Sequence, residues 1–393
     1  MARFSQLALS IEIDDEYWDP HSLVLRAPQK IEPKKSRVIF HEAVHFWQQC
    51  SQTFLAQIAD ENWSRLKTYE ETGEIRPPGP STIEYTCHIQ GHGFSARDLQ
   101  EGLARFWDVH VISPITLMDI EIEDSKRCIP KPAANEYRRI KRIASAIDPS
   151  GYPAAIYDLA MDFTAGNYAK PYIDLRERTS SYIATALFPL AGHFALQSDR
   201  PVPFFMDLVE RAIPHIDEKP GARVTDVWPL LYHRVRNLAV QLHKEQADRP
   251  FYPAAVVMAN SSLKDHPVYL YVVGLIHHLA REIVNTPAHV VPGYDNAPIV
   301  QRGTLSVDFF TACPGILKFN RTFLVSHLAP PCIRFADGRA WILRLEHLKE
   351  SYPDMKREEE LSIEGELRKL VEHMEEIEER WRRFRLASLR INV

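Results

Sequence analysis

Two histidines one helical turn apart, with a glutamate next to the first, form the stretch of this sequence best suited to chemistry. The stretch reads His41-Glu42-Ala43-Val44-His45. Residues four apart on an α-helix lie on the same face, so the imidazoles of His41 and His45 can bind one metal ion. Glu42 lies beside that face, where its carboxylate can take a proton from a water molecule at the metal. The spacing therefore predicts a metal site with its own general base.

The residues around this motif favour a buried helix. Ala43, Val44, Phe46 and Trp47 carry no charge, as a helix packed against a core requires. The motif resembles the extended signature of the zincin metallopeptidases, in which a Val or Thr precedes the first histidine by three residues. Val38 occupies that position. The resemblance implies zinc as the cofactor, with Fe²⁺ as the alternative, because two imidazoles and a carboxylate also suit non-haem iron.

A third ligand is expected on a later helix. Residues 99–106 read Leu-Gln-Glu-Gly-Leu-Ala-Arg-Phe and resemble the phrase that carries the ligand glutamate in the gluzincin group of metallopeptidases. The resemblance makes Glu101 the third ligand and leaves one coordination position open for water. Gly102 would let the two ligand helices approach closely. The resemblance covers about residues 37–108.

Other side chains compete for roles near the metal. Glu84 is an alternative third ligand, although its spacing from Ser81 also fits a capping box that would begin a helix. His88 and His92 have one-turn spacing, but glycines beside His92 weaken a helix there, so we expect both in a loop or around the ligands.

The sequence departs from the gluzincin pattern at one position. Many gluzincins carry an Asp four residues after the ligand glutamate, where it orients a ligand histidine; here that residue is Arg105. Asp98 or Asp108 could take this role from the same helical face, and the sequence does not show whether either does. A zinc hydrolase also needs a donor for the oxyanion of its tetrahedral intermediate. The sequence offers these candidates without choosing among them: Tyr157, Tyr168, Tyr172, Arg178 and His193.

Composition indicates a globular protein. Of 393 residues, 45% are hydrophobic and 25% charged, which is the balance of a soluble globular protein. No apolar run approaches the roughly 20 residues that a membrane span needs. The N-terminus lacks the pattern of a secretory signal, so we expect a cytoplasmic protein without membrane association. Five scattered cysteines argue against a disulfide framework. The net charge of −5 gives no reason to expect nucleic acid as a partner.

The predicted fold class is α+β and mainly helical, with a small β-sheet before the zincin-like active-site helix and a large helical remainder. Alternation predicts strands at 5–13 and 22–26, and capping signals predict one helix from about Arg37 to about Ala59. Further helices are expected from 81, at 95–107, 153–165, 168–197 (with a kink or break at Pro189), 202–213 and within 225–285. His277 and His278 are adjacent on the last of these and cannot face one metal. The expected divisions are a zincin-like metal-binding region at 1–110, a helical body at 111–345 with a Pro-rich strand and loop segment near 286–343, and a charged helix at 346–393.

The C-terminal helix carries a heptad pattern over about residues 354–385, which predicts a seam that packs on the protein's own body or pairs in a homodimer. The seam positions are Ile363, Leu367, Leu370, Met374, Ile377, Trp381 and Phe384.

The function that these patterns favour is a zinc-dependent metallopeptidase acting on a peptide or protein substrate. Glu42 would be the catalytic base, and His41, His45 and Glu101 would hold the metal; no binding residues for an organic cofactor are predicted. Two alternatives stay open: an iron enzyme that oxidatively modifies a peptide, and a catalytically inactive zincin-fold protein with an interaction or regulatory role.

Overall fold

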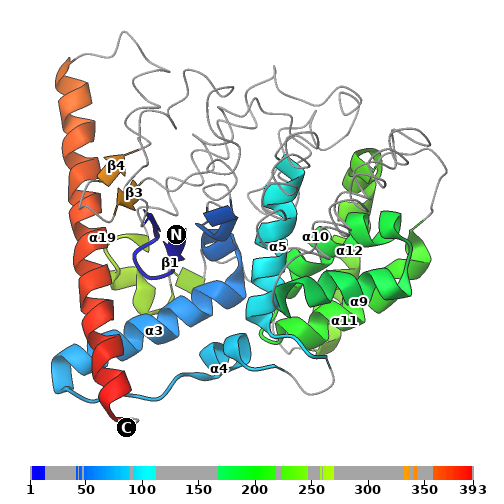
Figure 1. Ribbon diagram of the computed structural model, residues 1–393, viewed down its shortest axis with the longest axis horizontal. Coiled ribbons are helices and arrows are strands. Elements are labelled where there is room, and N and C mark those ends of the chain that lie inside the picture. The colour runs from blue at the N-terminus through cyan, green and yellow to red at the C-terminus, as the bar shows by residue number, and fades with distance from the viewer. Residues whose placement is uncertain are drawn as a thin grey trace, which may run out of the picture.

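The described part of the chain is mainly helical, with one small β-sheet (Figure 1), which confirms the predicted mixture of elements. None of the helices in the part of the chain that the structure describes is both long and apolar enough to cross a membrane. The computed structural model describes residues 2–13, 41–42, 44–46, 48–88, 92–111, 167–216, 224–246, 257–258, 260–269, 332–335, 340–342 and 357–391.

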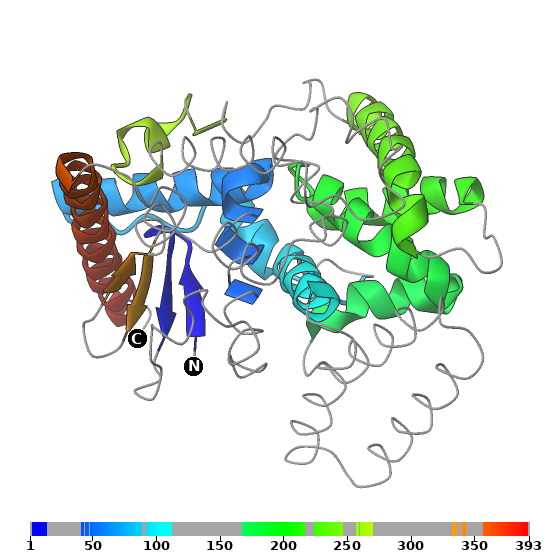
Figure 2. The same ribbon diagram turned by 90° about the horizontal axis from the view of Figure 1, so that it is seen from above.

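The sheet has four strands and joins the N-terminus to a segment more than 300 residues later. Its order is β1 (Ala2–Ser5), β2 (Ser10–Ile13), β3 (Cys332–Phe335) and β4 (Ala340–Ile342). The pairs β1–β2 and β3–β4 are antiparallel, whereas β2 and β3 run parallel with Ile11 opposite Ile333. The four strands lie side by side in Figure 2. Strands from the Pro-rich segment were expected, but their place beside the N-terminal strands was not.

The predicted single strand over 5–13 is wrong, because residues 6–9 form a turn and the segment is a hairpin. Leu7 and Leu9 belong to the turn, yet both are buried in the core. Leu9 has a φ of 53°, which is incompatible with a strand. The apolar alternation therefore continues through the turn because its leucines face inward, and it imitates one long strand.

The helix that carries the predicted metal-binding motif ends at Gln52. Helical residues 41–42, 44–46 and 48–51 come before Gln52, whose φ of −101° and ψ of 122° are extended, and α3 (Thr53–Thr72) follows. The prediction of one helix to about Ala59 is therefore wrong at this break. Gly73 ends α3 in the left-handed conformation, with a φ of 74°.

Gln197, from the turn after α10 (Ser181–Ala195), stabilises the break. Its Oε1 accepts from the backbone N–H of Thr53 at 3.1 Å and from the Thr53 hydroxyl at 2.8 Å, and its Nε2 donates to the carbonyl of Ser51 at 3.2 Å. The N–H of Phe54 donates to the carbonyl of Leu196 at 3.1 Å. Backbone groups that a continuous helix would pair are thus satisfied by a segment distant in sequence.

Helices α4 (Pro80–Thr86) and α5 (Ala96–Val111) follow α3. Helix α5 agrees with the helix predicted at 95–107. The expected capping role of Ser81 is wrong, since Gly79 is the N-cap and makes no side-chain cap bond. The carboxylate of Glu61, in α3, accepts instead from the backbone N–H groups of Ser81 and Thr82, each at 2.9 Å. A negative group at a helix N-terminus stabilises it through the unpaired N–H groups and the dipole.

A helical bundle packs against α5. It contains η2 (Asn167–Ala169), α9 (Lys170–Arg178), α10, α11 (Pro201–Ala212), η3 (Ile213–His215) and α12 (Val224–Gln246). Helix α10 lies against α5, α11 and α12 (Figure 1). It continues through Pro189 without a break, and the single helix expected over 168–197 is instead interrupted at residues 179–180, between α9 and α10. Phe188 makes edge-on ring contacts with Phe106 of α5 and Phe205 of α11, which fixes α5 against the bundle.

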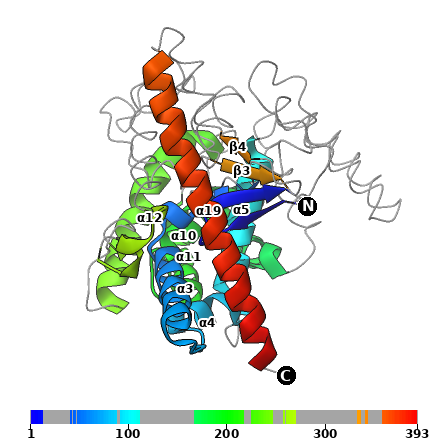
Figure 3. The ribbon, with the colours of Figure 1, turned by 90° about the vertical axis from the view of Figure 1, so that its left-hand side faces the viewer.

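The long C-terminal helix α19 (Arg357–Ile391) crosses α3 and passes beside the sheet (Figure 3). The guanidinium of Arg380 contacts both carboxylate oxygens of Glu70 at 2.6 Å and lies 5.2 Å from the ring centroid of Trp63. The hydroxyl of Ser5, on β1, donates to Glu378. The heptad seam packs on the protein's own body, because these seam positions are buried in the single chain: Leu367, Leu370, Met374, Ile377 and Phe384.

Several expected features lie outside the described residues. They are the strand at 22–26, the helix at 153–165, Val38, Ala43, Trp47, Tyr157, His277, His278 and the side chain of Asp108.

Candidate metal centre

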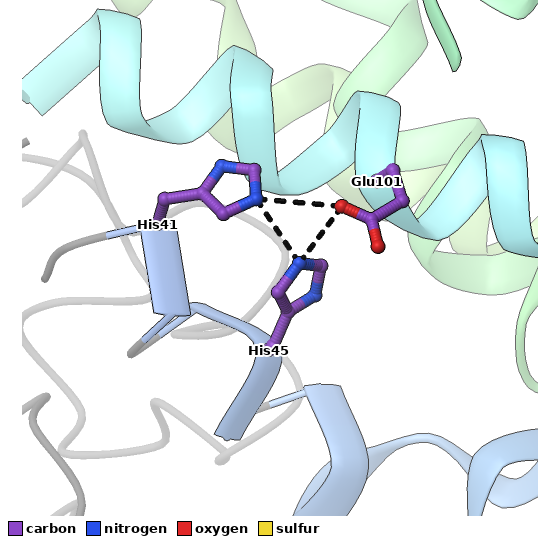
Figure 4. A group of neighbouring side chains, drawn as sticks. All are labelled: His41, His45 and Glu101. Carbon is purple, nitrogen blue, oxygen red and sulfur yellow. Dashed lines mark hydrogen bonds and ion pairs between the residues drawn. The ribbon is translucent and has the colours of Figure 1, made fainter. Parts of the chain in front are cut away.

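The three predicted ligands meet at one point (Figure 4). The Nε2 atom of His45 lies 3.1 Å from Nε2 of His41 and 3.1 Å from Oε2 of Glu101. The third separation, from Nε2 of His41 to Oε2 of Glu101, is 3.4 Å. The two histidines come from the same helical segment and Glu101 comes from α5, so two helices supply the three donor atoms.

These separations fit a small metal ion. In a tetrahedral zinc site, ligand distances of about 2.0–2.1 Å place neighbouring ligand atoms about 3.3 Å apart. The three donor atoms, at 3.1–3.4 Å from one another, span one face of such a tetrahedron. Lone pairs that converge in this way repel one another unless a proton or a cation lies among them. The same donor set of two imidazoles and one carboxylate also suits Fe²⁺.

The site reaches solvent on one side. His45 is buried, whereas the side chains of His41 and Glu101 are 22% and 32% exposed. Burial tends to raise the pKa of Glu101, but the hydrogen bonds and charges of His45 and His41 outweigh this effect and hold it well below its ordinary value. Glu101 is therefore ionised at neutral pH, and the partial exposure leaves the donor cluster open to water.

Gly102 permits a close contact beside the ligand on α5. A Cβ atom at this position would lie 2.3 Å from the backbone carbonyl oxygen of Tyr168 and 3.4 Å from the ring of Phe188. The expectation that Gly102 admits the other ligand helix is therefore wrong, because the segment that it admits is η2. The contact fixes α5, and with it Glu101, against the bundle.

Gln48 is a functional candidate that the sequence analysis missed. Its Oε1 lies 3.0 Å from Nδ1 of His45, and its Nε2 donates to the backbone carbonyl of Gln100 at 3.3 Å. The signal in the sequence is its position, three residues after His45 on the same helical face.

A hydrogen bond from Tyr85 holds the side chain of Gln100, the residue before Glu101. The hydroxyl of Tyr85, on α4, donates to Oε1 of Gln100 at 2.7 Å and accepts from Nε2 of Gln6 at 3.2 Å. Burial, followed by the nearby charge of Glu101, raises the pKa of Tyr85 well above its ordinary value. Tyr85 therefore remains a neutral donor, which ties α4 and the hairpin turn to α5.

The alternative candidates lie elsewhere. Asp98 accepts from the N–H of Ser95 at 2.7 Å and from its hydroxyl at 2.8 Å, and lies 3.3 Å from Nε2 of His88. Because Nδ1 of His45 faces Gln48, Asp98 does not orient that ligand. Glu84 is in α4, outside the donor cluster.

Among the predicted oxyanion donors that the structure describes, two make side-chain contacts away from the three donor residues. Tyr172 is buried, with its hydroxyl 3.2 Å from that of Thr185, and Arg178 donates to Glu210 at 3.0 Å. His193 is buried within α10. The backbone carbonyl of Tyr168 lies against Gly102, the residue after Glu101.

The predicted base, Glu42, is buried in the segment that carries both histidines.

Comparisons of the chain with protein-family models, with curated proteins and with solved structures find no match. The geometry of the donor cluster therefore carries the functional argument.

Proposed function

We propose that the protein is a zinc-dependent hydrolase that cleaves peptide bonds, with a zincin-like metal centre of the gluzincin type. The observation that carries this proposal is the convergence of three ligand atoms from His41, His45 and Glu101 within 3.1–3.4 Å of one another. A small sheet and a mainly helical body around the ligand helix agree with the proposal.

Each residue of the centre has a distinct role in this proposal. The two imidazoles present neutral nitrogen donors, and Glu101 supplies one negative charge. A zinc ion held there supplies a Lewis acid that polarises the substrate carbonyl and makes water more acidic. Glu42 takes the proton of the attacking water and later delivers it to the departing amine, so that the peptide bond is replaced by a carboxylate and an amine.

Two other functions use the same centre. The donor set also suits Fe²⁺, which would make the protein an oxygen-dependent enzyme that modifies a peptide. A catalytically inactive metal centre would leave an interaction or regulatory role. Metal content and dependence on oxygen separate the first alternative from hydrolysis, and the effect of removing the Glu42 carboxylate separates the second.

The test is hydrolysis of a mixed peptide library, followed by mass spectrometry, with zinc-loaded wild type and the Glu42→Gln variant. We expect wild type to cleave, and the variant to bind zinc equally while losing at least about 100-fold in rate, because the general base is gone. Glu84→Gln, which changes a carboxylate outside the donor cluster, is the control and keeps full activity. Equal cleavage by wild type and Glu42→Gln, or no cleavage by the zinc-loaded wild type, would contradict the proposal.

A further inference from the structure

We propose that Gln48 is a positioning residue that fixes the tautomer of His45 and links the two ligand helices. The inference rests on the metal centre proposed above, but concerns the imidazole itself. It starts from two hydrogen bonds of one buried amide, to Nδ1 of His45 and to the backbone carbonyl of Gln100.

The first step concerns the orientation of the Gln48 amide. The carbonyl of Gln100 has only lone pairs, so the group that faces it at 3.3 Å has to be the NH₂ of Gln48. The oxygen of the amide then faces the other way, toward Nδ1 of His45 at 3.0 Å. One fixed acceptor in the backbone of α5 therefore decides which end of the amide His45 meets.

The second step concerns the proton on His45. An amide oxygen can only accept, so Nδ1 of His45 has to carry the hydrogen. In a neutral imidazole the other nitrogen, Nε2, then holds the lone pair. Nε2 is the atom that faces His41 and Glu101. The carbonyl of Gln100 orients the Gln48 amide, and the amide oxygen places the hydrogen of His45 on Nδ1. The lone pair on Nε2 is then available to bind a metal ion.

The third step concerns the distance between the ligand helices. Gln48 lies three residues after His45, and Gln100 immediately precedes Glu101. The bond from Gln48 to Gln100 therefore joins the helices within one turn of the ligands on each side. Tyr85 holds the Gln100 side chain from a third helix. Gln48 accordingly controls both the lone pair of His45 and the approach of Glu101.

Three variants separate the effects of Gln48 on the His45 tautomer and on the link between the helices from ordinary packing. Gln48→Leu removes both hydrogen bonds and keeps a side chain of similar size. Gln48→Glu keeps an acceptor for His45 but has no donor for the carbonyl of Gln100, so it should rescue the tautomer. Gln49→Leu is the matched control, since Gln49 is also buried and donates to the carbonyl of Leu55 at 2.7 Å instead of contacting a ligand.

The experiment combines two readouts that do not require activity. Nitrogen-15 NMR of metal-free protein labelled at histidine, at about pH 8.5, where an ordinary histidine is neutral, reports which nitrogen of His45 carries hydrogen. Competition with a zinc chelator gives the zinc affinity. We expect His45 with hydrogen on Nδ1 in wild type, Gln48→Glu and Gln49→Leu. In Gln48→Leu we expect mixed tautomers and zinc affinity weakened about 10–100-fold.

Two results would overturn the inference: Gln48→Leu with the wild-type tautomer and zinc affinity, or Gln49→Leu with the same changes as Gln48→Leu. The tautomer readout also distinguishes the two proposals. If wild type binds no zinc but Gln48→Leu alters the tautomer, the proposed function fails and the role of Gln48 stands. If zinc binding and hydrolysis are found but Gln48→Leu changes neither readout, only the inference about Gln48 fails.

Discussion

The Nε2 atom of His45 lies 3.1 Å from Oε2 of Glu101, although 56 residues of sequence separate the two. One residue belongs to the helical segment that ends at Gln52 and the other to α5. Their distance therefore depends on contacts that hold each helix in place. Two of those contacts, at Gly102 and at Gln197, can be tested without altering a ligand.

Gly102→Ala should destabilise the protein and weaken zinc binding. The new Cβ would lie 2.3 Å from the carbonyl oxygen of Tyr168, so backbone has to move. We expect a loss of about 1–3 kcal/mol in the free energy of unfolding, as for overpacked cores, measured by urea denaturation. The control is Gly365→Ala, in α19, where nothing lies within 4 Å of the new atom. It should stabilise by about 0.5–1 kcal/mol; the same stability change in both variants would contradict this account.

Gln197→Leu should weaken the break between the ligand helix and α3. It removes the acceptor for the backbone N–H of Thr53 and the donor to the backbone carbonyl of Ser51. The expected loss in the free energy of unfolding is about 1–3 kcal/mol, with a measurable loss of zinc affinity. Gln241→Leu, which removes an exposed bond to Glu245 on α12, should change neither quantity. Unchanged stability and zinc affinity in Gln197→Leu would show that the break does not need this residue.

Arg380→Ala should loosen the C-terminal helix. Arg380 makes two hydrogen bonds to Glu70 and lies over Trp63, so its removal should cost about 1–2 kcal/mol of unfolding free energy. Arg368→Ala breaks only an exposed pair with Glu364 on the same helix and should cost about 0.3–0.5 kcal/mol. Urea denaturation measures both, and equal losses would argue against a docking role for Arg380.

His193 should make the fold sensitive to acid. Burial lowers the pKa of His193 from 6.5 to about 3. Between these values the unfolded chain binds a proton that the folded chain does not, so stability falls as the pH drops below 6.5 and is unaffected above it. At pH 5 the loss is about 2 kcal/mol, from 1.5 pH units at about 1.4 kcal/mol each.

The control for this acid sensitivity is His193→Leu, because leucine cannot bind a proton in the unfolded chain. Urea unfolding at pH 7 and pH 5 should show the variant losing about 2 kcal/mol less than wild type between the two values. His266, whose pKa burial also lowers to about 3, remains in both proteins and contributes equally to their acid sensitivity. Identical losses in the two proteins would mean that His193 is protonated in the folded state.

Local sequence patterns predict correctly those helices and site residues whose positions depend on contacts within one helix. The two histidines on one helix follow from i, i+4 spacing, and α5, α11 and α19 follow from their helical sequence pattern, chiefly apolar periodicity. Glu101 could be assigned only through the family resemblance, because nothing within its helix indicates what it faces. The structure brings it to the two histidines.

Tertiary contacts decide the features that the sequence did not reveal. Glutamine is a good helix former, yet the helix breaks at Gln52, where Gln197, 144 residues from Thr53, bonds backbone groups on both sides of the break. The cap of α4 comes from Glu61 of another helix instead of Ser81. Gln48 was overlooked because its role depends on the carbonyl of Gln100, 52 residues away.

The central claim is that His41, His45 and Glu101 hold one metal ion, and elemental analysis tests it most directly. Purified protein should be measured beside His45→Ala, Glu101→Ala and the control Glu84→Ala, each after reconstitution and dialysis. The account predicts about one zinc per chain in wild type and in the control, and a loss of bound metal in both ligand variants. Absence of metal from reconstituted wild type, or full retention in both ligand variants, would contradict it. One iron per chain would keep these ligands and replace hydrolysis by oxygen chemistry.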